Sequence, residues 1–176
     1  MNTTPADSLA QRLPQQLDLS QRHTWQPAIS GDIDIVIDRN SRWFHCGDPF
    51  TREKIERLFC QLLRREEGGE YFLVTPVEKW RITVEAAPLR VIAMEIGQGQ
   101  IQFACNDGSD FLLGPDHSIQ ALAHSTGALP VIAVRDGLCA LIERHYYYRL
   151  AEEASWESEQ AWIGTVGAKQ LLPTLE

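Results

Sequence analysis

One segment constrains the fold more than any other, because it carries a helical apolar stripe within a chain of strand-like segments. Its apolar residues recur at intervals of three and four positions, and they are Ile55, Leu58, Phe59, Leu62 and Leu63. Thr51 is suited to cap the N-terminus of a helix, and Gly68-Gly69 is suited to end one. The pattern predicts a helix over residues 52–66 whose apolar face packs against neighbouring strands.

The segments on either side of this helix have the short, apolar and often alternating character of strands. The predicted strands cover residues 31–37, 42–45, 71–74, 80–84, 89–96, 100–105, 110–113, 131–134 and 138–142. Asp136-Gly137 is the favoured pair for a two-residue hairpin, since both residues tolerate positive φ. Runs of strands with few helices indicate an α+β protein.

Three further segments complete the assignment. Residues 116–124 are predicted as a short helix, residues 143–153 as a longer helix and residues 162–172 as a final strand pair. Residues 89–97 and 129–137 are identical at five of nine positions. This echo is explained either by the shared preference of buried strands for Val, Ile and Ala or by an internal duplication.

The charge of the chain limits its partners. With 24 acidic and 16 basic residues the net charge is −8, and no arm or helix face concentrates the basic residues, so nucleic acid is not an expected partner. No signal peptide or run long enough to cross a bilayer is present, so no membrane association is expected and the cytoplasm is the expected location. The four cysteines are widely spaced and are expected to stay reduced there.

Two stretches resemble a known bacterial family, with a weaker third. They are RWFHCGDPFTREKIERLFCQLLRREEGGEYFLVTPVEKWRITVEAAP at residues 42–88, VIAVRDGLCALIERHYYYRLAE at residues 131–152 and WIGTVGAKQLLP at residues 162–173. In the third, Gly164 and Pro173 are in place, whereas Gln170 and Leu171 stand where the family has aromatic residues. The chain thus resembles the family called domain of unknown function 1285.

The resemblance implies an α+β fold made of two similar half-barrel motifs of antiparallel strands, each with a packed helix. The halves are placed at residues 29–88 and 89–155, with residues 156–176 packing back on the body. Residues 1–28 are rich in Gln, Ser, Thr and Pro, and they are expected to form a flexible N-terminal arm. The family implies no established chemistry; signalling or ligand sensing is only a suggestion attached to it.

Polar residues that flank the apolar elements are the candidates for a ligand site. They are Arg42, His45, Arg65, Glu78, Lys79, Arg135 and Arg144. An arginine fork suits a carboxylate or phosphate, and the alternative is that such residues form solvated ion pairs at the ends of elements. We expect no metal ligand set, because four donors at a zinc spacing are missing, and we assign no catalytic residue and no cofactor.

The leading hypothesis is a non-enzymatic binding or regulatory module that recognises a small anionic ligand or a protein partner in a cleft between the two halves. The first alternative is an uncharacterised hydrolase or transferase that uses His45, His117 or Glu78. Asp116 and His117 follow Gly114-Pro115 in a predicted loop. The simpler role for Asp116 is to cap the helix that is predicted to follow. The second alternative is a scaffold for oligomerisation or protein interaction.

Overall fold

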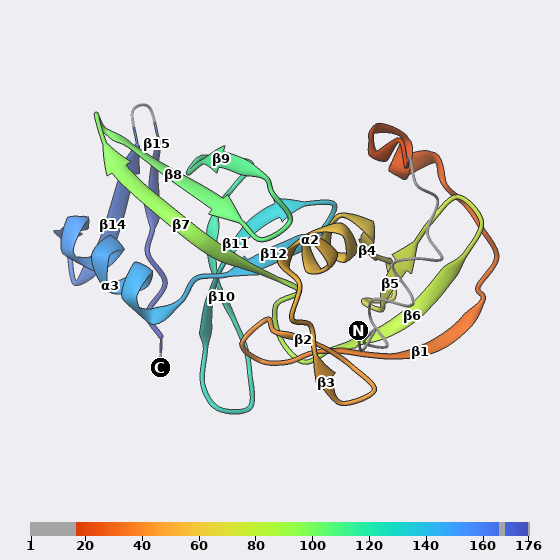
Figure 1. Cartoon of the computed structure of the whole chain (residues 1–176). Coiled ribbons are helices and arrows are strands. Elements are labelled where there is room, and N and C mark those ends of the chain that lie inside the picture. Colours follow the sequence, from red (N-terminus) through yellow and green to blue (C-terminus); the bar gives the residue numbers. More distant parts are fainter. Residues whose placement is uncertain (1–16, 166–167, 176) are drawn as a thin grey trace. The chain divides into compact units, whose positions relative to one another are not determined.

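The chain is seen here as a computed structural model that describes residues 17–165 and 168–175 (Figure 1). It forms two compact units, an N-terminal unit of residues 1–85 and a C-terminal unit of residues 86–176. Within the described residues, no helix is long and apolar enough to cross a membrane.

A six-stranded sheet with the order β3-β2-β1-β6-β5-β4 forms the N-terminal unit. Its strands are β1 (Gly31–Ile37), β2 (Trp43–His45), β3 (Asp48–Pro49), β4 (Leu63–Arg65), β5 (Tyr71–Val74) and β6 (Lys79–Val84). Neighbouring strands are antiparallel except β1 and β6, which run parallel at the centre of the sheet. The strands predicted at residues 31–37, 71–74 and 80–84 are therefore confirmed.

The helix of this unit is shorter than the apolar pattern predicts. Helix α2 spans Glu53–Leu62, and its N-cap residue is Arg52, without a side-chain capping bond from Thr51. The chain leaves the helix at Leu63 and pairs as β4 with β5, from Leu63 opposite Leu73 to Arg65 opposite Tyr71. The predicted end at Gly68-Gly69 is wrong because strand pairing replaces the last helical turn. Gly69, at φ 83°, instead serves the turn between β4 and β5.

The core of the N-terminal unit lies between α2 and the sheet. Phe59 and Leu62 of the helix are buried, as is Leu63 in β4, whereas Leu58 is half-buried. The rings of Trp43, Phe50 and Phe59 pack edge to face or tilted, with centroids 5.5–6.3 Å apart. Within α2, the apolar face that the periodicity predicts therefore packs in the core.

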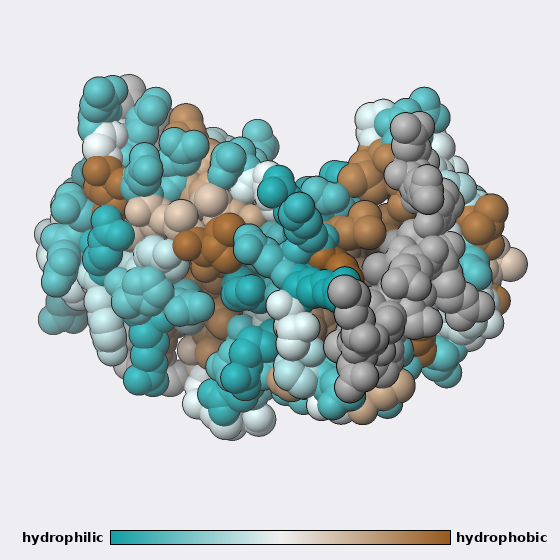
Figure 2. Space-filling view, viewed as in Figure 1, coloured by the Kyte–Doolittle hydropathy of each residue, from teal (hydrophilic) through white to brown (hydrophobic). Residues whose placement is uncertain are grey.

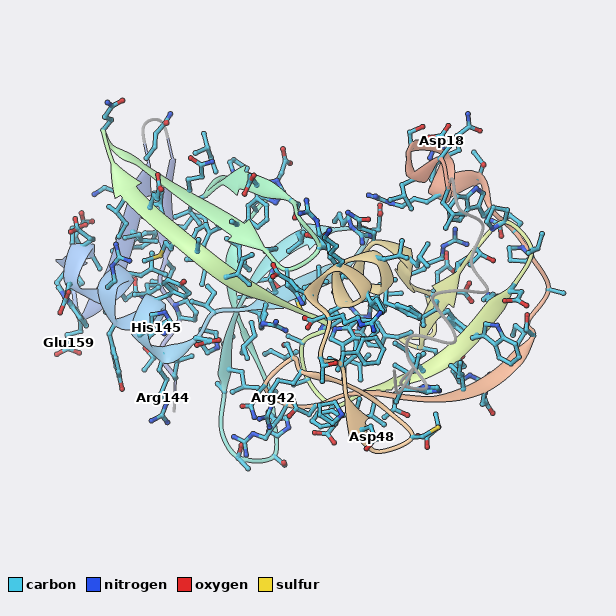
Figure 3. The ribbon with its side chains drawn as sticks, viewed as in Figure 1. Asp18, Arg42, Asp48, Arg144, His145 and Glu159 are labelled. Atoms are coloured by element: carbon cyan, nitrogen blue, oxygen red, sulfur yellow. The ribbon has the colours of Figure 1, made fainter. Side chains whose placement is uncertain are left out.

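The segment before β1 is partly structured. Residues 1–16 of the expected arm lie outside the described residues, but Leu19–Thr24 forms a 3-10 helix, η1, which Asp18 caps through the N–H of Ser20 (Figure 3). The guanidinium of Arg64 donates to the carbonyl oxygens of Arg22 at 2.6 Å and Trp25 at 2.8 Å. Residues 19–25 are therefore docked on β4 through Arg64.

The C-terminal unit contains a second six-stranded sheet, in the order β10-β11-β12-β7-β8-β9. Its strands are β7 (Leu89–Gly97), β8 (Gln100–Cys105), β9 (Asp110–Leu112), β10 (Ile119–Leu122), β11 (Leu129–Arg135) and β12 (Leu138–Leu141). Neighbouring strands of this sheet are antiparallel except β12 and β7, which run parallel at its centre.

The two sheets share one topology. Each consists of two three-stranded meanders, and the first strand of the first meander pairs in parallel with the last strand of the second. Strand β7 corresponds to β1 and β11 to β5, so two similar α+β halves are present. The echo between residues 89–97 and 129–137 lies in β7 and β11, which are not equivalent positions. It is therefore not a trace of this repeat.

Two local predictions in the C-terminal unit have opposite outcomes. Asp136 and Gly137 have φ of 48° and 73° and form the two-residue turn from β11 to β12, as the sequence predicts. The short helix predicted at residues 116–124 is wrong, because Ile119–Leu122 is strand β10. Ile119 is buried opposite Ile132, so pairing with β11 satisfies the backbone that a helix would have satisfied internally.

The helix predicted at residues 143–153 is confirmed as α3, Arg144–Glu153, which buries Leu150 completely. A three-stranded antiparallel sheet follows, made of β13 (Ser155–Glu157), β14 (Gln160–Thr165) and β15 (Ala168–Leu171). The predicted final strand pair is β14 and β15, although its Gly167 lies outside the described residues. Tyr147 of α3 donates to the carbonyl oxygen of Pro173 at 2.5 Å, which ties the last segment to the helix (Figure 1).

Candidate functional site

Arg42, the first candidate residue, closes a turn. Its Nε and Nη2 donate to Oδ2 of Asp38 at 2.9 and 2.7 Å, and its guanidinium lies 5.9 Å from the ring centre of Phe44 (Figure 3). Burial alone would raise the pKa of Asp38, but hydrogen bonds from Arg42 and from the N–H of Asn40 outweigh it and hold that pKa below its usual value. The pair stabilises the link between β1 and β2.

Lys79 and Glu78 also have partners inside the N-terminal unit. The ammonium of Lys79 forms an ion pair with Glu66 and lies 4.4 Å from the centre of the buried Phe72 ring. The carboxylate of Glu78 accepts from Nε1 of Trp80 at 3.2 Å. A ligand at either residue would compete with these contacts.

His45 and Arg65 occupy different strands of the same sheet. Nδ1 of His45 and Nε1 of Trp43, two residues apart on β2, are buried without a hydrogen-bond partner among the described residues. The guanidinium of Arg65 stacks 5.7 Å from the ring centre of Tyr71, its cross-strand neighbour. His45 lies opposite Ile35 of β1 and Asp48 of β3 in the sheet.

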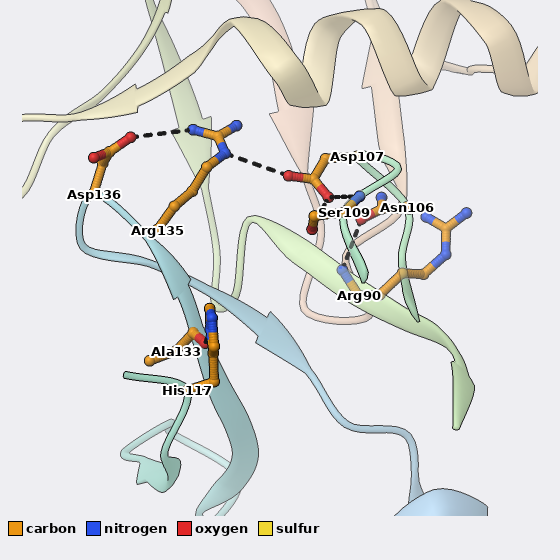
Figure 4. A network of polar contacts seen from close by, with 8 residues as sticks. All are labelled: Arg90, Asn106, Asp107, Ser109, His117, Ala133, Arg135 and Asp136. Carbon is orange, nitrogen blue, oxygen red and sulfur yellow. Dashed lines mark hydrogen bonds and ion pairs between the residues drawn. The ribbon is translucent and has the colours of Figure 1, made fainter. Parts of the chain in front are cut away.

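Arg135, at the end of β11, belongs to a polar network in the C-terminal unit (Figure 4). Its Nε lies 3.3 Å from Oδ2 of Asp107, and its Nη1 lies 3.7 Å from Oδ2 of Asp136. Asp107 also accepts from the N–H and hydroxyl of Ser109 at 3.0 and 2.5 Å. This network connects the turn after β8 to the β11–β12 hairpin.

The remaining candidates lie apart from that network. Arg144 is the exposed first residue of α3 and projects away from β7 (Figure 3). Nδ1 of His117 lies 3.0 Å from the carbonyl oxygen of Ala133 and must be the donor, since a carbonyl only accepts (Figure 4). The His117 ring stacks on Phe111 at 4.2 Å. Arg65 belongs to the N-terminal unit and Arg144 to the C-terminal unit.

No cluster of three or more His, Cys, Asp or Glu side chains with metal-binding geometry occurs in the described part of the chain. Burial, reinforced by Asp107 and Asp110, raises the pKa of the Cys105 thiol far above its usual range. This thiol is therefore protonated at neutral pH and is a poor nucleophile.

A pocket of about 290 Å³ lies in the C-terminal unit, on residues that the sequence pattern did not single out. It is lined by Glu95, Ile96, Gly97, Gln98, Gln100, Gln102 and Leu112. These residues come from β7, the β7–β8 turn, β8 and β9. The region around the tip of this hairpin is hydrophilic in Figure 2.

The pairing of the strands explains how the pocket forms. Glu95 lies opposite Gln102, Gly97 opposite Gln100, and Gln102 opposite Leu112, so their side chains share one face of the sheet. The other face of the hairpin is core, where Ile101 and Phe103 are buried. One face of the hairpin thus packs in the core, and the opposite face presents polar side chains to the solvent.

The polar side chains of the pocket have unused hydrogen-bonding capacity. Glu95, Gln98, Gln100 and Gln102 make no side-chain hydrogen bond or ion pair with other residues that the structure describes. At Gly97, which lines the pocket, an added Cβ would meet nothing within 4 Å, so there is space for a side chain there. In the sequence, the pocket is marked only by Gln100 and Gln102, which alternate with apolar residues after the turn Gly97-Gln98-Gly99. This pattern is typical of any hairpin with a polar outer face, so it did not indicate a site.

Comparison with protein families agrees with this two-unit architecture. Residues 22–87 match the N-terminal domain of unknown function DUF1285, and residues 88–170 match the C-terminal domain of the same family. The chain belongs to the DUF1285 family. No curated protein matches it.

Two solved DUF1285 structures are similar to this chain. A DUF1285 family protein from Silicibacter pomeroyi DSS-3 is 32% identical, with a TM-score of 0.84, over 98% of this chain and 97% of that one. A DUF1285 family protein from Shewanella baltica OS155 is 26% identical, with a TM-score of 0.54, over 70% of this chain and 94% of that one. DUF1285 is a family of unknown function, so the function must be argued from the site.

Proposed function

We propose that this DUF1285 protein is a non-enzymatic binding module that takes a small ligand in the pocket between β7, β8 and β9. The observation that carries the proposal is the combination of a 290 Å³ hollow with four polar side chains that have no partner among the described residues. The hydrogen bonds between β7, β8 and β9 hold these side chains at a fixed spacing, as a ligand site requires.

The basic candidate residues contribute less to a ligand site than the pocket does. Arg42 is held by Asp38, Lys79 by Glu66 and Arg135 by Asp107. An anionic ligand at these residues would have to displace a carboxylate that the protein already supplies. The pocket on β7 and β8 needs no such displacement, because its polar groups face solvent.

A thermal-shift screen tests the proposal, because a ligand that binds only the folded state raises its stability by mass action. The screen compares the natural protein with Gly97→Val, whose side chain would occupy space that Gly97 leaves open in the lining of the pocket. A valine is compatible with this strand position, since Gly97 does not have positive φ. Hits that stabilise the natural protein but not Gly97→Val support the proposal, and hits that stabilise both equally place the ligand elsewhere.

Protein interaction is the second candidate function, favoured by the exposed aromatic side chains of the C-terminal segment. Trp156 in β13 is 69% exposed and Tyr148 in α3 is 59% exposed. Sedimentation velocity of the natural protein and of Trp156→Ser tests it. A larger species that is lost in Trp156→Ser would support self-association through this segment, and a monomer at all concentrations would argue against it.

A further inference from the structure

The chemical groups of the β7–β8–β9 pocket select among classes of ligand. We propose, on the basis of the binding function proposed above, that the pocket takes a neutral, hydroxyl-rich ligand of about the size of a monosaccharide.

The hydrogen-bonding inventory is the first argument. Gln98, Gln100 and Gln102 each present an amide that offers two N–H donors and one carbonyl acceptor. A hydroxyl group is likewise both donor and acceptor, so a ligand with several hydroxyls can use both ends of each amide. A ligand with acceptors alone, such as a phosphate or a carboxylate, would leave every amide oxygen unused.

The charge of the pocket is the second argument. Its lining contains one carboxylate, Glu95, and no basic residue, in a chain of net charge −8. An anion would therefore be repelled. A single exposed carboxylate also holds a cation weakly, because ion pairs between exposed groups contribute little. A carboxylate that accepts from a hydroxyl, in contrast, forms a charge-assisted hydrogen bond without a counter-charge.

The arrangement of these groups is the third argument. Glu95 and Gln102 lie directly opposite each other on β7 and β8, at the spacing of a cross-strand pair, about 4.5–5.5 Å between Cβ atoms. Neighbouring hydroxyls on one ring can reach both side chains. Leu112, 45% exposed and opposite Gln102 on β9, adds an apolar surface for the C–H face of such a ring.

Size is the fourth argument. The pocket volume of about 290 Å³ lies just below the range for drug-sized ligand sites, roughly 300–1,000 Å³. Gly97 contributes to this volume because it leaves open the space that a side chain would occupy. A single sugar or cyclitol ring suits this volume better than an oligosaccharide or a nucleotide.

The experiment is an NMR titration of the full-length protein, with backbone and glutamine side-chain amides as the readout. The hydroxyl-rich probes are D-glucose, D-galactose and myo-inositol; the comparison probes are spermidine as a cation and citrate as an anion. We expect at least one hydroxyl-rich probe to shift the signals of residues 95–102 and Leu112 in a saturable way, and spermidine and citrate not to do so.

Three variants refine the test. Gln102→Ala is expected to raise the Kd of that probe about fivefold, the effect of one lost hydrogen bond. Glu95→Gln keeps a hydrogen-bond acceptor but removes the charge, and it is expected to raise the Kd of the probe by a smaller factor. Gly97→Val is expected to abolish the shifts. Gly164→Val is the matched control, since Gly164 also lies in a strand of the C-terminal unit with ordinary space around its Cβ, and it should bind as the natural protein does.

The outcomes separate the ligand class from the binding function. If only spermidine or citrate shifts these signals, and Gly97→Val removes the effect, the pocket binds ligands but the hydroxyl-rich class is wrong. If no probe shifts them, both the class and the proposed site are overturned. If glucose or inositol shifts them equally in Gly97→Val, its site lies elsewhere and the inference fails.

Discussion

Arg135 is held by a buried carboxylate: its Nε lies 3.3 Å from Oδ2 of Asp107, whose side chain is 3% exposed. The Arg135 side chain is itself only 14% exposed. A buried pair of this kind adds little stability compared with an apolar replacement, but removal of one partner leaves the other charge in the interior without its ion pair, which is destabilising.

The first prediction follows from this pair. Arg135→Met should lower the free energy of unfolding by about 3–5 kcal/mol, because the buried Asp107 carboxylate then loses its ion pair with Arg135. The double variant Arg135→Met/Asp107→Asn should recover part of that loss. Urea denaturation measures both. Arg42→Met is the control, since the Arg42 side chain is 63% exposed and its loss should cost less than about 1 kcal/mol. Equal losses at Arg42 and Arg135 would contradict the prediction.

The second prediction concerns acid stability. The pKa of Asp38 is lowered from its usual 3.8, so the folded state binds this proton less readily than the unfolded state does. The stabilisation from Asp38 is therefore fully present above pH 3.8 and is lost as the pH falls through the lower, folded-state pKa. Asp38→Asn removes the charge, so its stability should fall less steeply below about pH 4. Thermal melts of both proteins across this pH range test the prediction. An equal decrease of the melting temperature with falling pH in both proteins would refute it.

The third prediction tests the packing of α2. Leu62→Ala should lower the free energy of unfolding by about 2–5 kcal/mol, because Leu62 is 3% exposed and its loss leaves a cavity. Leu58→Ala, on the same helix but half-buried, should cost clearly less. Chemical denaturation compares them. A cost below about 1 kcal/mol at Leu62 would mean that the helix is peripheral to the core.

The fourth prediction concerns the docked segment before β1. Arg64→Met removes the donor to the carbonyls of Arg22 and Trp25, and it should cost about 1.5–3 kcal/mol, the range for hydrogen bonds to a charged group. Deletion of residues 1–25 removes both acceptors and should give a comparable loss. The combined variant should lose less than the sum, since both changes break one interaction. Fully additive losses would show that Arg64 does not hold this segment.

Local sequence signals determined much of the fold. The apolar spacing from Ile55 to Leu62 predicted the helix α2, because residues three and four apart share one face wherever the helix packs. The pair Asp136-Gly137 predicted its hairpin, because few other residues tolerate positive φ at both turn positions. Both signals depend on backbone geometry within a few residues, and the surroundings did not override them.

Tertiary pairing decided the rest. Leu63, Arg64 and Arg65 carry a helical pattern, yet they form β4 because β5 offers an unpaired edge, and Ile119–Leu122 becomes β10 for the same reason on β11. The pocket is also tertiary in origin, since Glu95, Gln102 and Leu112 come together only through the register of three strands. Sequence alone determines which face of a strand is polar, whereas the register that places these side chains opposite one another is set by the packing of the whole sheet.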